Sequence, residues 1–208
     1  SFRDGNMEIF ISDSLLNNQK RITWNKVDEI HPCISPDGKR LVFTEGNQAD
    51  NQTKIVVMNV DGSNRRYITN NKNTFGAIPT FNRDGSKITY AEWHKNPKSG
   101  FLSNPYIVVY DFTNEVKTFI TNDSFECWRP IFSPNDKGLF YISKENNNQF
   151  DVYEHSFKTN QKKNITQSDF EEWDVALSYD EKYLAYAGNK DGNWDLFLLE
   201  LETGKILQ

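Results

Sequence analysis

The sequence predicts an all-β protein built as a β-propeller, in which four-stranded antiparallel sheets, the blades, stand around a central axis. Three observations predict this fold. Strand-forming residues fall in short runs separated by Asp-Gly, Asn and Pro, and no stretch shows sustained helical periodicity. One pattern of strand and turn also returns four times. Its Ser/Asn column at positions 35, 82, 133 and 178 gives spacings of 47, 51 and 45 residues, a period typical of propellers or solenoids.

Each repeat contains four strands that can be justified in order. A first strand runs into a tight turn such as Ser35-Pro36-Asp37-Gly38. The second strand carries two columns two residues apart, which face the same side. A third strand carries one apolar column, and the fourth carries an Ile-Thr pair whose Ile follows the third-strand residue by 13 positions. The second-strand columns are Leu41, Ile88, Leu139, Leu184 and Phe43, Tyr90, Tyr141, Tyr186; the third-strand column is Ile55, Ile107, Val152, Leu196; the fourth-strand isoleucines are Ile68, Ile120 and Ile165.

Sheets with apolar residues on both faces must pack against neighbours, so we expect the columns to fill the seams between blades. The repeat divides the chain into a half blade over 1–23 and blades over about 28–70, 75–122, 126–167 and 171–208, about four and a half in all. Asp4-Gly5-Asn6 and Asp191-Gly192-Asn193 fall at the same phase. We therefore expect the chain to be a partial ring of a longer protein with at least five blades, because an open blade edge leaves strand groups unpaired.

Composition narrows the function classes. Lys and Arg number 24 against 29 Asp and Glu, a net charge of -5, which argues against broad capture of nucleic acid. No apolar run approaches the roughly 20 residues needed to cross a bilayer. Cys33 and Cys127 fall at different phases of non-adjacent repeats, so we expect two free thiols. No nucleophile elbow, zinc motif or phosphate-binding glycine loop is present, and we assign no catalytic residue, metal ligand or cofactor.

The binding surface is predicted from propeller geometry. Tight turns gather on one face, and the longer connections, including Gly46 to Thr53 and His94 to Asn104, gather on the other. On that second face, the segments entering the inner strands place four residues in one column at the channel mouth, with tryptophans just before it and carboxylates close by. The column is His31, Ile78, Arg129 and Asp174, and the neighbours are Trp128, Trp173, Glu29 and Glu172.

We expect this face and channel mouth to bind a protein or peptide. Trp24, Trp93, Trp128 and Trp173 would be apolar anchors, and Arg129 would hold a carboxylate. Two alternatives stay open. The tryptophans can simply fill space between blades while the charges solvate the rim. His31 with Glu29, Asp174 and Glu172 can also form a metal site or an acid/base pair, although a polar channel rim is favoured.

The turn Ser-Pro-Asp-Gly-Lys at 35–39, with Ile30-His31-Pro32 before it and Arg40-Leu41-Val42-Phe43 after it, resembles the repeat of TolB-like propellers, called the PD40 or WD40-like β-propeller repeat. The segments 191–197 and 202–204 resemble it too, whereas Ser178-Tyr179-Asp180-Glu181 departs from the turn pattern. The resemblance implies a parent with six blades.

The resemblance also implies two functions. One is a non-catalytic interaction or scaffold propeller of a bacterial envelope, periplasmic or envelope-associated, that binds a protein or peptide, with no nucleic acid and no direct membrane insertion. The alternative is the gating propeller of a serine peptidase or other hydrolase, similar to prolyl oligopeptidases, whose catalytic domain lies outside this chain. A shared fold does not choose between them.

Overall fold

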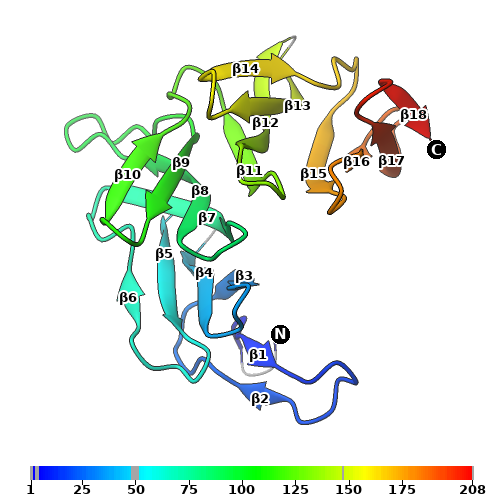
Figure 1. The fold of residues 1–208 in the computed structure, drawn as a ribbon. Coiled ribbons are helices and arrows are strands. Elements are labelled where there is room, and N and C mark those ends of the chain that lie inside the picture. Colours follow the sequence, from blue (N-terminus) through cyan, green and yellow to red (C-terminus); the bar gives the residue numbers. More distant parts are fainter. Residues whose placement is uncertain (1, 3–4, 48–51, 147, 208) are drawn as a thin grey trace.

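The computed structural model describes residues 2, 5–47, 52–146 and 148–207, and over these residues it is all-β. Four antiparallel four-stranded sheets stand side by side around a common axis, with a two-stranded sheet beside the first of them (Figure 1). The predicted fold class, a β-propeller of four-stranded blades, is confirmed. The sheets follow one another along an arc in chain order, so each one packs against the next (Figure 1).

Every sheet is a meander in which strands adjacent in sequence are paired. The two-stranded sheet pairs β1 (Phe10–Ile11) with β2 (Lys20–Arg21). The four blades consist of β3 (Glu29–Ile34), β4 (Arg40–Asn47), β5 (Gln52–Asn59) and β6 (Arg66–Tyr67); β7 (Thr74–Phe81), β8 (Lys87–His94), β9 (Tyr106–Asp111) and β10 (Val116–Phe119); β11 (Cys127–Phe132), β12 (Gly138–Asn146), β13 (Gln149–Ser156) and β14 (Gln161–Asn164); and β15 (Glu172–Leu177), β16 (Tyr183–Gly188), β17 (Asp195–Glu200) and β18 (Lys205–Leu207).

The core lies in the seams between consecutive sheets. Alternate residues of a strand point to opposite faces, so each central strand contributes to two seams. Tyr90, for example, packs with Ile55 and Val57 of the preceding blade, while its neighbour Ala91 packs with Leu139 and Tyr141 of the following one. Both second-strand columns are buried, with no member more than 3% exposed. Burying one such side chain contributes about 1.5 to 3 kcal/mol, so the seams dominate the stability of the fold.

The Ile-Thr pairs close each blade through a repeated hydrogen-bond pattern. The backbone N–H of Ile68 donates to the carbonyl of Ile55 at 2.8 Å, and the Thr69 hydroxyl oxygen accepts the N–H of Ile55 at 2.9 Å. The same two bonds join Ile22 and Thr23 to Ile9, Ile120 and Thr121 to Ile107, and Ile165 and Thr166 to Val152. The 13-residue spacing seen in the sequence is therefore the register of the third and fourth strands.

Two expectations differ from the structure. Leu196 pairs with Ala187 at the register of its column, but it is 79% exposed because none of the described strands packs on that face of the fourth blade. Gly46 and Thr53, expected in a long loop, are paired strand residues that extend the β4–β5 hairpin, and Thr53 is buried because its hydroxyl donates to the Gly76 carbonyl. Residues 48–51 of that predicted loop, and Asp4, lie outside the described part of the chain.

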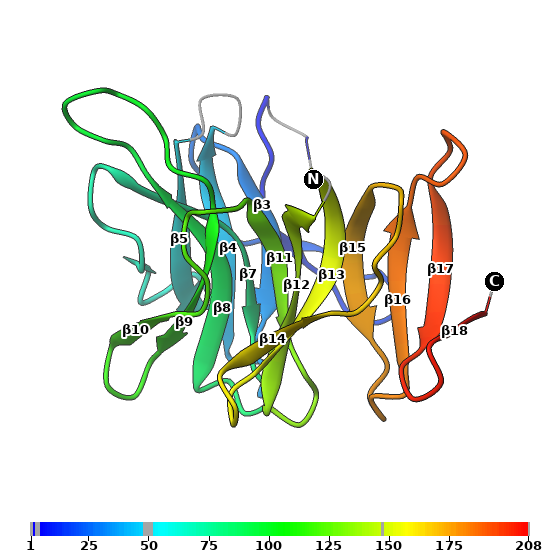
Figure 2. The same ribbon diagram turned by 90° about the horizontal axis from the view of Figure 1, so that it is seen from above.

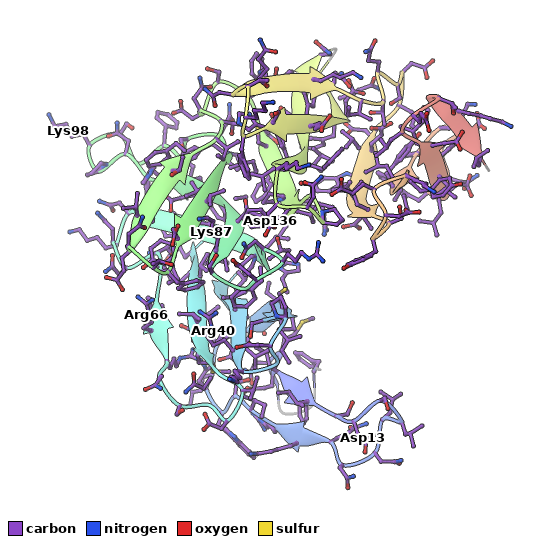
Figure 3. All side chains as sticks on the ribbon, in the orientation of Figure 1. Asp13, Arg40, Arg66, Lys87, Lys98 and Asp136 are labelled. Atoms are coloured by element: carbon purple, nitrogen blue, oxygen red, sulfur yellow. The ribbon has the colours of Figure 1, made fainter. Side chains whose placement is uncertain are left out.

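The two faces of the propeller differ as expected. Seen from the side, short turns gather at one end of the strands and longer connections at the other (Figure 2). On the tight-turn face, Arg40 reaches the next blade and donates to the Gly85 carbonyl at 2.7 Å. Asp136 accepts from the backbone N–H of Arg83 at 3.1 Å, again across a seam. Lys98, near the tip of the connection after β8, projects to the outside of the arc (Figure 3).

Candidate functional site

The four residues of the predicted inner column share an unusual backbone conformation. His31, Ile78, Arg129 and Asp174 have φ angles of 49°, 58°, 52° and 48°, in the left-handed region. Each stands where the pairing of the first and second strands shifts register, so each is the extra residue of a β-bulge. A left-handed non-glycine residue costs about 1 to 3 kcal/mol and persists only where surrounding structure imposes it. The bulge recurs at the same position in all four blades, and bulges commonly change the direction of a side chain.

Three of these side chains converge although they come from different blades. Arg129 forms an ion pair with Asp174, and its guanidinium lies over the Trp173 ring, 5.5 Å from the ring centroid. Burial lowers the pKa of His31 and nearby Arg129 lowers it further, while Asp174 acts in the opposite direction. His31 in the first blade therefore lies near enough to Arg129 and Asp174, on the third and fourth blades, for their charges to act on its pKa. The three side chains form one polar cluster, which we call the axial cluster: His31, Arg129 and Asp174.

The axial cluster is not saturated by hydrogen bonds. The buried Nδ1 of His31 and Nε of Arg129 find no hydrogen-bond partner among the described residues. Buried polar atoms without partners cost free energy and are uncommon, so they suit a site that a ligand completes. An arginine N–H together with an imidazole nitrogen can bind a carboxylate or an amide carbonyl.

An aromatic pocket adjoins the cluster along β11. Trp128 directly precedes Arg129, and its ring meets that of Trp93 edge to face with centroids 5.3 Å apart. Both rings line a cavity of about 270 Å³ together with Leu102, Pro105 and Glu126; Ser103 and Asn104 complete the lining. We call this cavity the tryptophan pocket. Its lining combines the two rings and other apolar groups with polar ones, including the Glu126 carboxylate, and residues 102–104 of the connection between His94 and Asn104 form part of it.

That connection forms a projecting hairpin. Lys95 and Leu102 are bridged, and the Ser103 N–H donates to the His94 carbonyl at 2.8 Å. Phe101, which belongs to this hairpin, is 78% exposed. The prediction that 94–104 forms a long connection on the face opposite the tight turns is therefore matched, and residues 102–104 of this connection line the pocket.

Glu29 and Glu172 do not lie on the channel rim. Both are buried in seams, 2% and 0% exposed, and this corrects the expectation that they flank the mouth. Glu172 accepts from the Val152 N–H at 3.1 Å and from the Thr166 hydroxyl at 2.5 Å, and so joins the third and fourth blades. Burial raises the pKa of both carboxyls to about 7. The reason is their register: they stand two residues before the bulge, where the strand still faces the neighbouring sheet.

The four tryptophans predicted as anchors differ in their burial and in their neighbours. Trp173 contacts Arg129, and Trp93 and Trp128 share the pocket, although Trp93 is only 4% exposed. Trp24 is 74% exposed beside the two-stranded sheet, where Arg21 stacks over its ring at 4.5 Å. The structure thus brings together three of the four predicted anchors. Leu102 and Pro105 also line the pocket, but the sequence did not predict them as site residues. Only the length of the 94–104 connection indicated this region.

The described residues contain no group of three or more His, Cys, Asp and Glu side chains arranged to hold a metal ion. Cys33 and Cys127 are both free thiols, as predicted. In the part of the chain that the structure describes, no helix has the length and apolar character needed to cross a membrane.

Comparison with known proteins extends the description of the fold. No known protein family matches the sequence, and no curated protein matches it. Among solved structures, the chain is similar to TolB from Acinetobacter baumannii, with a TM-score of 0.77 and 22% identity over 95% of this chain and 47% of that protein. A putative TolB from Agrobacterium tumefaciens gives a TM-score of 0.72 and 15% identity over 91% of this chain and 68% of that one.

Enzymes share the fold as well. A puromycin-hydrolyzing peptidase from Mycobacterium tuberculosis gives a TM-score of 0.68 and 15% identity, over 94% of this chain and 30% of that protein. The chain thus spans about half of the first TolB and less than a third of the peptidase. At these identities the likeness establishes a β-propeller fold of the kind found in TolB and in peptidases, and both functional readings are compatible with it.

Proposed function

We propose that this propeller is a non-catalytic binding module that holds an extended peptide segment of a partner protein across the axial cluster and the tryptophan pocket. One observation carries the proposal: the bulged inner strands keep His31, Arg129 and Asp174 in a strained backbone conformation with buried polar atoms left for a ligand. Beside them, Trp93 and Trp128 offer an aromatic pocket of the kind that anchors interface residues.

The two parts of the site predict the features of the peptide. An acidic side chain or carboxy terminus would accept from Arg129, in competition with Asp174, which is 64% exposed at its side chain and free to move aside. An apolar or aromatic side chain would enter the tryptophan pocket. Similarity to TolB supports an envelope location for the parent protein, and we propose this location together with the binding role.

The second reading, a gating propeller of a hydrolase, is supported by similarity to peptidases. The two readings differ in what lies outside the chain: an α/β domain with a Gly-x-Ser-x-Gly elbow supports the hydrolase, and further propeller repeats or an envelope anchor support the binding module.

Selection from a library of random peptides tests the binding role. The immobilised chain is expected to enrich peptides that combine an acidic group with an aromatic or aliphatic residue. Arg129→Ala and Trp128→Ala should each weaken the selected peptides about tenfold or more, since hot-spot residues contribute about 2 kcal/mol or more. Arg83→Ala, on the tight-turn face, is the matched control and should leave binding unchanged. Failure to enrich any sequence, or equal loss in Arg83→Ala, refutes the proposal.

A further inference from the structure

A second cavity lies away from the axis, between the outer strands of the second and third blades. It has a volume of about 530 Å³, within the range of small-molecule sites. Phe119 and Phe125 stand at its mouth, 60% and 41% exposed. Its inner lining includes the buried Cys127 and His155, and Glu145 and Lys162 close one side; Ile120, Thr121, Asn122, Ser124 and Asn160 complete it. Neither the axial cluster nor the tryptophan pocket contributes to it.

Beside this cavity, the third blade departs from the repeat at one position. In the second blade, Glu92 fills this position and accepts from the Tyr90 hydroxyl at 3.0 Å and from Lys117 at 2.6 Å. In the first blade, Glu45 fills it and pairs with Arg65.

In the third blade the register places Ser143 there, facing Cys127 across the strands with Sγ and Oγ 3.3 Å apart. The fourth blade has Gly188, but the rings of Phe170 and Phe197 fill the space beside it.

The groups that bind this carboxylate in the second blade are still present in the third. Tyr141 stands at the register of Tyr90, and Lys162 at that of Lys117. The Tyr141 hydroxyl is buried with no hydrogen-bond partner among the described residues. Burial raises the pKa of the Tyr141 hydroxyl, and its electrostatic interactions with Cys127 and Glu145, two residues of the cavity lining, raise it further. A hydroxyl donor and a lysine thus stand at the registers of the two groups that bind Glu92 in the second blade, while Ser143 stands at the register of Glu92 itself.

We propose that this cavity binds a small organic carboxylate with an apolar body, whose carboxylate takes the place that Glu92 occupies in the second blade. The carboxylate accepts from the Tyr141 hydroxyl and from Lys162, and the apolar body lies between Phe119 and Phe125.

Lys162 is paired with Glu145, whose side chain is 13% exposed against 47% for Lys162, and the Lys162 ammonium carries three N–H donors, enough for both carboxylates. Burial lowers the pKa of His155, so the imidazole at the inner wall is neutral at pH 7 and adds no charge.

The test uses 3-phenylpropionate as the probe and 3-phenylpropionamide as its neutral counterpart, titrated into the ¹⁵N-labelled chain. We expect the acid to shift the backbone amides of Thr121, Cys127 and Ser143, and the amide to bind about tenfold more weakly or worse, because a charge-assisted hydrogen bond is lost. A short peptide ending in Phe, with a free or an amidated carboxy terminus, shows whether the acid can also come from a chain end.

Variants separate this site from a nonspecific cavity. Lys162→Met and Tyr141→Phe should each weaken the acid several-fold, and Lys163→Met, the exposed neighbour on the other face of β14, should have no effect. Ser143→Glu supplies the missing carboxylate from the chain itself, so it should abolish binding. Equal binding of acid and amide, no binding of the acid to the wild-type chain, or equal loss in Lys163→Met would overturn the proposal.

Discussion

Replacing Glu172 by Gln should make the stability of the propeller less dependent on pH. Glu172 is fully buried in the seam between the third and fourth blades, and burial raises its pKa from 4.5 to about 7. The folded state therefore holds a proton that the unfolded state releases between these two values. Since the folded state binds more protons in that window, the free energy of unfolding falls as the pH rises from about 4.5 to 7 and then levels off.

The magnitude follows from the size of the shift. Each pKa unit corresponds to about 1.4 kcal/mol, so the raised pKa of Glu172 costs roughly 3 kcal/mol above pH 7. The Gln carbonyl can still accept from the Val152 N–H and the Thr166 hydroxyl. Glu172→Gln should then be about 2 to 3 kcal/mol more stable than the wild-type chain at pH 8 and nearly equal to it at pH 5.

Urea denaturation followed by tryptophan fluorescence at pH 5 and pH 8 measures this difference. Glu202→Gln, at an exposed turn, is the control and should follow the wild-type chain at both pH values. A Glu172→Gln variant that is destabilised by the same amount at both pH values would show that the carboxyl carries no ionisation penalty and would refute the reasoning.

Two further predictions concern the seams. Gly76→Ala places a Cβ 2.9 Å from Ile55 Cγ1 and should lower the free energy of unfolding by about 1 to 3 kcal/mol, measured by the same urea denaturation. An unchanged denaturation midpoint would mean that the seam has room for the added methyl group. Ile107→Ser should lower the free energy of unfolding by about 2 to 4 kcal/mol, whereas Leu196→Ser, at the equivalent but exposed position, should lower it by less than about 0.5 kcal/mol. Similar losses at both positions would contradict the exposure of Leu196.

Much of the architecture could be predicted from the sequence because the repeat encodes it directly. Columns such as Leu41 to Leu184 keep one phase across four blades, and burial in the seams requires that phase. The axial column was also visible, since His31, Arg129 and Asp174 stand at matched phases. Their left-handed backbone was not, because none of them is a glycine and the bulge depends on pairing with the next strand.

The burial of the neighbouring carboxylates could not be predicted in the same way. Glu29 and Glu172 lie only two residues from the column, and polar residues near a loop are expected to be exposed. The burial of Glu172, for example, depends on donors from the preceding blade, the Thr166 hydroxyl and the Val152 N–H, and these meet the carboxylate only when the two blades pack together. Leu196 shows the converse: its apolar character and register predict burial, but exposure is decided by whether another sheet covers it.

The binding role is tested most directly by nuclear magnetic resonance of the five tryptophan indoles in the presence of a selected peptide. The account predicts that the indole N–H resonances of Trp93, Trp128 and Trp173 shift with the peptide, because these rings line or adjoin the proposed site, and that those of Trp24 and Trp194 stay in place. Shifts confined to Trp24 and Trp194, with the other three unchanged at saturation, would contradict it.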